Sequence, residues 1–359
     1  VVTGDEKIVG FEVVNKDGAP ALKYSEEIMG REDDPDVLAN PTSIVLSTDG
    51  AYAFVGLGMK GGRGCGLTVI DVLDGGTPFL AGSVRGCTKG RGLRNVVDVA
   101  VGADGGAALV YVVAGKRAGV EADDDVGAEA ALTLIHVSNK YRPGIRATQN
   151  LWPGEIYQKT YPTALEVRGT FAYVLTVGTF PGISVVDVGD PDNLHFINSP
   201  GGVFDDSYRA TRFPSAIAVS PDWPVGTWAV VVDQGYGETL TFDVSKSDTW
   251  GIRLMGYQSW DIEDGISNPV AVSLWGTTAV VAFKGATDAT DAGTLSLIDV
   301  SDLSSPAFVR HVENLRAPSS VVVQVVPPFG PLAFVTEESG NALLVAQLNN
   351  EPPAPPAPP

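Results

Sequence analysis

The chain repeats a set of short apolar strands, and this repetition limits the folds open to it more than any other feature. A period of about 40 to 55 residues is typical of propellers and solenoids. Each repeat begins with a first strand rich in small and branched residues, which suits the innermost position of a propeller blade. Copies of this strand lie at Pro41–Ser47, Asn95–Val101, Pro162–Val167, Pro214–Val219, Pro269–Leu274 and Pro318–Val323.

Two further strands follow each first strand. The second is enriched in aromatic and β-branched residues, as expected of a β-strand. Its copies lie at Tyr52–Val55, Leu109–Val113, Phe171–Leu175, Trp228–Val232, Thr278–Ala282 and Leu332–Val335. The third ends in Ile-Asp-Val or a variant, with copies at Gly10–Val13, Val69–Val72, Leu134–Val137, Val185–Val188, Thr241–Val244, Leu297–Val300 and Val345–Leu348.

Seven third strands against six first strands predict an all-β protein, a β-propeller of seven four-stranded blades. Residues 1–28 then contribute the late strands of an incomplete first blade, and the last repeat supplies three strands. A segment upstream of Val1 would supply the missing strand and close the ring, because closure removes exposed sheet edges. Six blades with a redundant strand are the alternative. We expect a single propeller over residues 1–350 and a Pro-rich linker or tail over 351–359.

The third-strand copies resemble a known repeat. Val185–Leu194 reads VVDVGDPDNL and Leu297–Pro306 reads LIDVSDLSSP. These segments are similar to the LVIVD-type β-propeller repeat, in which a strand is followed by a Ser-Asp/Asn-Pro turn. The resemblance implies the fold and a cell-surface or secreted setting, but it carries no catalytic residue. The recurring Asp is expected to be structural, since its carboxylate ends a strand beside turn N–H groups that need acceptors.

The chain is strongly acidic, with a formal net charge of −19. Such a surface repels phosphate backbones, which argues against nucleic-acid binding. It also disfavours anionic membranes, and no apolar run reaches the roughly 20 residues that span a bilayer. We therefore expect protein partners, or neighbouring copies in an assembly.

The two cysteines, Cys65 and Cys87, flank neighbouring strands of one predicted blade. Because the third and fourth strands run antiparallel, the start of one lies beside the end of the other, and a disulfide can form. Such a bridge indicates an oxidising compartment. Two free thiols packed as small apolar groups are the alternative.

Several connections carry candidate binding residues. Carboxylates at Asp123, Asp124, Asp125, Asp288 and Asp291 are possible Ca²⁺ ligands, although none has the spacing of a defined calcium loop, and solvated acidic loops are the alternative. A basic group and two aromatic residues form a possible interface: Lys60, Arg63, Arg85, Lys89, Arg91, Arg94, Trp152 and Tyr157. Ordinary charge scatter, and Trp152 folding back on its own blade, are the alternatives.

Three functions follow from these features. The first is a non-enzymatic interaction or structural module of a larger extracellular or cell-surface assembly. The second is a propeller hydrolase, a lactonase or calcium-dependent esterase, acting at the central channel. The scarcity of histidines, with His136, His195 and His311 on separate repeats, counts against it. The third is an intracellular scaffold for peptide ligands, which reduced cysteines would favour.

Overall fold

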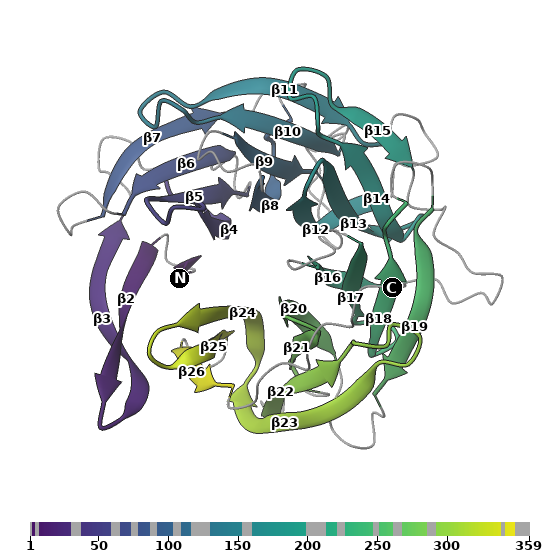
Figure 1. Cartoon of the computed structure of the whole chain (residues 1–359). Helices are drawn as coiled ribbons and strands as arrows, with labels where there is room; N and C mark the ends of the chain where they lie inside the picture. Colours follow the sequence, from purple (N-terminus) through teal and green to yellow (C-terminus); the bar gives the residue numbers. More distant parts are fainter. Residues whose placement is uncertain are drawn as a thin grey trace. The chain divides into compact units, whose positions relative to one another are not determined.

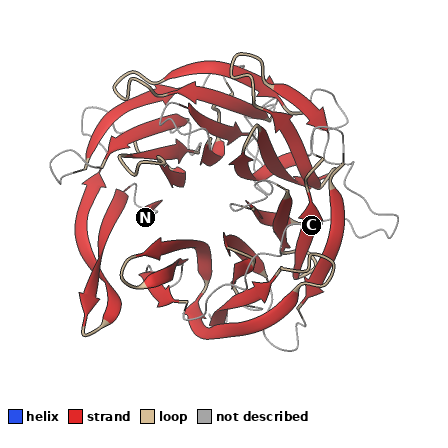
Figure 2. Cartoon of the chain, in the orientation of Figure 1, coloured by secondary structure: helices blue, strands red, loops and turns tan. Residues whose placement is uncertain are grey.

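The computed structural model describes residues 2–3, 7–29, 37–58, 65–72, 78–86, 92–102, 109–115, 130–152, 160–198, 213–220, 227–246, 251–260, 268–285, 292–338 and 342–348. Over these ranges the chain consists of strands and turns (Figure 2). The strands form seven antiparallel sheets, five of four strands and two of three. The predicted all-β, seven-bladed propeller is confirmed.

Each sheet is one blade, numbered here 1 to 7 along the chain (Figure 1). Blade 1 comprises β1 (Val2–Thr3), β2 (Lys7–Lys16) and β3 (Ala19–Met29). Blade 2 comprises β4 (Pro41–Leu46), β5 (Tyr52–Leu57), β6 (Gly66–Asp71) and β7 (Phe79–Arg85). Blade 3 comprises β8 (Val96–Val101), β9 (Leu109–Ala114), β10 (Ala131–His136) and β11 (Gly144–Asn150). Blade 4 comprises β12 (Thr160–Arg168), β13 (Phe171–Gly178), β14 (Gly182–Asp187) and β15 (His195–Asn198).

The remaining blades repeat the same order. Blade 5 comprises β16 (Pro214–Val219), β17 (Trp228–Asp233), β18 (Glu238–Asp243) and β19 (Arg253–Ser259). Blade 6 comprises β20 (Pro269–Trp275), β21 (Thr278–Phe283), β22 (Ala292–Asp299) and β23 (Ala307–Arg316). Blade 7 comprises β24 (Pro318–Val326), β25 (Gly330–Glu337) and β26 (Ala342–Gln347). The chain divides into two compact units, the first of Val1–Phe11 and Tyr24–Pro200, the second of Glu12–Lys23 and Gly201–Pro359.

Every described first strand carries a β-bulge near its start, where one residue has no partner on the second strand. In blade 2 this residue is Thr42. Its hydroxyl lies 2.9 Å from the carbonyl oxygen of Val96 in blade 3 and 3.2 Å from that of Gly56 in its own blade. Ser215 makes the same link in blade 5, 2.9 Å from the carbonyl oxygen of Pro269 in blade 6. The bulge thus frees a hydroxyl that bonds the next blade.

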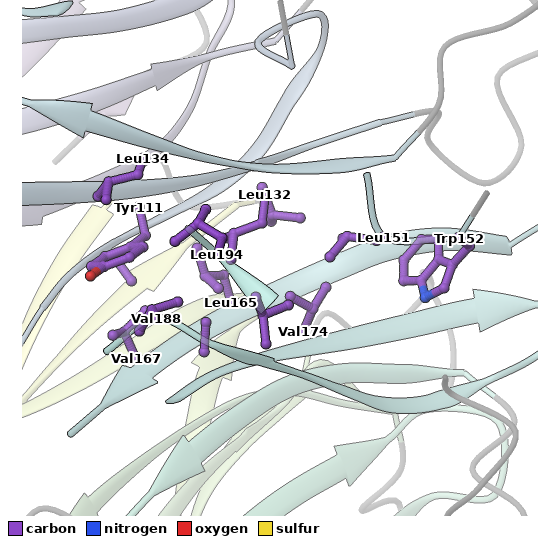
Figure 3. Close-up of a cluster of buried hydrophobic side chains, with 14 residues drawn as sticks. Tyr111, Leu132, Leu134, Leu151, Trp152, Leu165, Val167, Val174, Val188 and Leu194 are labelled. Carbon is purple, nitrogen blue, oxygen red and sulfur yellow. The ribbon is translucent and has the colours of Figure 1, made fainter. Parts of the chain in front are cut away.

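Apolar side chains fill the layers between successive blades. Figure 3 shows one layer, in which Leu132 of β10, Leu165 of β12 and Val174 of β13 form part of a cluster between blades 3 and 4. Each is at most 4% exposed. Burying such a side chain contributes roughly 1.5–3 kcal/mol, and a blade alone would leave one face of these residues in water. Stacking of blades is therefore the main source of stability.

The aspartates that end the third strands are structural, as predicted from the sequence. The carboxylate of Asp187 accepts a hydrogen bond of 2.9 Å from the backbone N–H of Gly189. Asp243 and Asp299 accept equivalent bonds, each 2.9 Å, from the residues two positions later. Each bond fixes the tight turn into the fourth strand, which explains why this residue recurs.

Candidate functional site

The structure describes one of the two cysteines. Cys65 is fully buried immediately before β6, and its carbonyl oxygen accepts a 3.2 Å bond from the N–H of Gly86. Cys87 follows Gly86 in the sequence but lies outside the described residues. The register therefore places Cys65 beside Gly86, and the disulfide itself stays a prediction.

The proposed calcium ligands Asp123, Asp124, Asp125, Asp288 and Asp291 also lie outside the described residues. Within the described part of the chain, no three His, Cys, Asp or Glu side chains gather closely enough to hold a metal ion. Ca²⁺ binding by these five residues stays a prediction.

The possible interface of basic and aromatic residues is described only in part. Arg85 ends β7 and Arg94 lies two residues before β8, both half-buried, whereas Lys60, Arg63, Lys89, Arg91 and Tyr157 fall outside the described ranges. Trp152 is 7% exposed and packs in the layer between blades 3 and 4, where its indole N–H donates a 3.0 Å bond to Ser184 (Figure 3). Its side chain is part of the core in this structure, so it is not presented to a partner.

The three histidines lie on three different blades, at the end of β10, the start of β15 and within β23. His136 is exposed and lies 3.3 Å from the hydroxyl of Ser138 in the following turn. The expectation that the histidines occupy separate repeats is confirmed.

An exposed apolar surface lies on β23, the fourth strand of blade 6. Phe308 and Val309 are 41% and 48% exposed, and we call these two adjacent residues the β23 surface. Val312 is 37% exposed but faces the other side of the sheet, because it pairs with Leu295 whereas Phe308 pairs with Ile298. The fourth strand of blade 3 is different, because the exposed side chains of β11 are the polar Arg146, Thr148 and Asn150. Isolated exposed apolar residues are normal, whereas an adjacent aromatic and β-branched pair on an outermost strand is a candidate contact surface.

The β23 surface is held by aromatic packing. The Trp260 ring contacts Phe283 of the core edge-to-face at 5.1 Å and Phe308 at 5.6 Å. The Phe308 ring also lies 4.9 Å from that of His311. Val309 is the bulge residue of β23, since Ile298 pairs with Phe308 and Leu297 pairs with Arg310. A rigid aromatic residue next to a bulge is well suited to anchor a partner at little entropic cost.

Sequence reasoning missed this surface. Its only signal is the run Ala307-Phe308-Val309, which breaks the alternation of apolar and polar residues expected of a strand with one solvated face.

The carboxylate of Asp98, on β8, links the first strands of blades 2, 3 and 4. One carboxylate oxygen of Asp98 accepts a 2.6 Å bond from the Ser43 hydroxyl, and the other accepts a 2.8 Å bond from the backbone N–H of Leu165. Burial raises the pKa of Asp98 above its usual range, although these bonds act in the opposite direction. Asp98 therefore satisfies the open edge of β12 with a side chain from the preceding blade.

Glu166 lies on β12, beside the hydrogen bonds of Asp98. Burial, and then the negative charge of Asp98, raise the pKa of Glu166 to about 7, while the Arg168 guanidinium 2.8 Å away lowers it. The side chains of Glu166 and Arg168 are 22% and 32% exposed. A carboxyl group that is half-protonated near neutral pH can act as a general acid or base.

Comparison with known proteins agrees with the fold. The LVIVD repeat family model matches residues 289–314, so the resemblance predicted from the sequence is confirmed in that repeat. No curated protein matches the chain. Over the described residues, no helix is long and apolar enough to cross a membrane.

Several solved structures share the architecture. A functionally unknown protein from Desulfotomaculum acetoxidans aligns with a TM-score of 0.67 at 11% identity, over 98% of this chain and 92% of its own. A candidate 6-phosphogluconolactonase from Bacteroides uniformis gives 0.63 at 12%, over 95% and 88%. The periplasmic gluconolactonase of Pseudomonas aeruginosa gives 0.59 at 14%, over 85% and 80%. At these identities the likeness concerns the fold, which hosts many functions.

Proposed function

We propose that this chain is a protein-interaction or structural module of a larger extracellular or cell-surface assembly. The observation that carries the proposal is the β23 surface, in which Phe308 and Val309 are each more than a third exposed. Aromatic residues anchored in this way are frequent hot spots of protein interfaces. The net charge of −19 adds a preference for partners with a basic rim.

An extracellular setting follows from the proposed bridge between Cys65 and Cys87, because such bonds persist in oxidising compartments. Intact mass of the denatured chain after alkylation, with and without prior reduction, tests it directly. Two alkyl groups added only after reduction support the bridge. Two cysteines that alkylate fully in denaturant without reductant argue for an intracellular module instead.

The interaction itself is tested by photo-crosslinking. A benzophenone amino acid placed at Val309 should crosslink a partner in a surface or secreted fraction from the source cells, and the same label at Leu46 of β4, which is 54% exposed, serves as the control. The purified partner should then bind Phe308→Ala at least tenfold more weakly than the native chain, as expected on losing a hot spot. Equal adducts at both positions, or unchanged affinity, would contradict the proposal.

The hydrolase remains a second candidate because Glu166 has a pKa of about 7 and adjoins Asp98. In that role the carboxyl group would transfer a proton during ring opening of a lactone or cleavage of an ester. Turnover of glucono-δ-lactone and of p-nitrophenyl acetate, with and without millimolar Ca²⁺, tests it. Turnover above the buffer rate that Glu166→Gln abolishes supports the hydrolase, and turnover unchanged in that variant rejects the assigned role.

A further inference from the structure

In the part of the chain that the structure describes, blade 7 has three strands where blades 2 to 6 have four. Its order is β24-β25-β26, and within the described residues no strand pairs with the outer side of β26. The burial of the third strand shows the consequence. Every residue of β6, the third strand of blade 2, is buried beneath β7, whereas Ala342 to Ala346 of β26 are only half-buried and Gln347 is exposed.

The register identifies which backbone groups are directed outward. The N–H of Leu348 donates a 3.0 Å bond to the carbonyl oxygen of Pro331, which makes this a hydrogen-bonded pair. In an antiparallel ladder such pairs alternate, so Leu343, Val345 and Gln347 direct their N–H and C=O groups away from β25. The equivalent residues of β6 are Leu67, Val69 and Asp71, and β7 pairs with all three.

The outer edge of β26 lacks the features that protect sheet edges. The segment Ala-Leu-Leu-Val-Ala-Gln contains no charge, no proline and no glycine, and its pairing with β25 has no bulge. Natural proteins protect exposed edges with such features because an unprotected edge pairs with other chains. An apolar edge with three outward peptide groups is therefore built to receive a strand.

We propose that the edge of β26 binds an extended strand of a partner protein, with apolar residues at alternate positions and basic residues flanking it. The strand completes blade 7 as an antiparallel fourth strand, with a bulge opposite Val345 and Ala346 as in the five complete blades. The basic flanks follow from charge complementarity with a chain of net charge −19.

Charge also weighs against two other occupants. A second copy would bring another 19 negative charges to an edge with no charge of its own to offset them. The chain's own residues 351–359 contain six prolines, which have no N–H to donate to β26. This inference rests on the proposed interaction function but uses a different surface from β23, so the two can fail separately.

The probe is a fluorescein-labelled peptide with the sequence of β7, Phe-Leu-Ala-Gly-Ser-Val-Arg, titrated with the full chain and followed by anisotropy. Saturable binding is expected. Val345→Pro should weaken it at least tenfold, because proline removes an outward N–H while leaving the bonds to β25 intact. Val345→Thr keeps the N–H and the β-branched shape, and it should bind within threefold of the native chain. Replacing the peptide arginine by glutamate should weaken binding at low salt.

Hydrogen exchange measured by mass spectrometry locates the contact. Amides of residues 342–348 should exchange faster than those of β6 in the chain alone and become protected with the peptide. Prior protection in a monomer would mean that another segment of the same chain covers the edge, such as the upstream strand expected from the repeat count, and a dimer that Val345→Pro dissociates would mean a second copy. Either result overturns the proposal, as does peptide binding that Val345→Pro leaves unchanged. Loss of crosslinking at Val309 with binding at β26 intact would instead reject the β23 surface alone.

Discussion

Blade 2 and blade 7 carry the same repeat and differ in one strand. Leu67 and Leu343 occupy equivalent positions, opposite Gly56 and Thr336 on their second strands. Leu67 is fully buried, and Leu343 is half-buried. The difference shows that the burial of a third strand is not a property of its own sequence. It depends on what packs against the strand: Leu67 packs with side chains of blade 3 and lies under a fourth strand, whereas the described residues of blade 7 include no fourth strand.

Truncation of these two leucines gives the largest expected contrast. Leu67→Ala should lower the free energy of unfolding by about 2–5 kcal/mol, because it leaves a cavity in a packed core. Leu343→Ala should cost less than about 1 kcal/mol, since its side chain is already partly solvated. Denaturant unfolding followed by tryptophan fluorescence measures both. Equal losses would show that another part of the molecule covers β26.

The first strands offer a second contrast, in which Glu166 of blade 4 and Val322 of blade 7 occupy the same position after the bulge. The pKa of Glu166 is raised from 4.5 to about 7, so the folded state retains a proton that the unfolded chain releases. Stability from this group is complete below pH 4.5 and is lost as the pH rises through 7. Glu166→Gln should remove this loss, on the order of 2 kcal/mol after allowing for its 22% exposure.

Thermal melting at several pH values between 4.5 and 8 measures the effect. The native chain should become less stable relative to Glu166→Gln as the pH increases. Val322→Gln is the matched control, because Val322 is 54% exposed and the substitution adds no ionisable group. If Glu166→Gln and the native chain keep a constant difference over this range, the carboxyl group ionises at its ordinary pKa.

The sequence predicted what local repetition determines. The order of the strands, their approximate positions and the structural role of aspartates such as Asp187 all follow from residues that are neighbours along the chain. The hydrogen bonds of Asp98 and the raised pKa of Glu166 depend on side chains that meet only when blades stack. Ser43 and Asp98, for example, lie 55 residues apart along the chain. The candidate metal ligands, chosen from composition, fall in connections outside the described residues, so they remain predictions.

The smallest contrast concerns the bulge hydroxyls. Thr42 bonds the carbonyl oxygen of Val96 in the next blade, whereas Ser319 of blade 7 bonds Thr336 of its own blade in an exposed position. Thr42→Val keeps the shape and removes the bond, so it should cost about 1 kcal/mol, since the carbonyl oxygen loses a partner in a half-buried site. Ser319→Ala should change the free energy of unfolding by less than about 0.5 kcal/mol, because water replaces the hydroxyl. Equal losses in Thr42→Val and Ser319→Ala would argue against this role of the hydroxyl, because the Thr42 hydroxyl bonds the next blade and the Ser319 hydroxyl bonds its own blade.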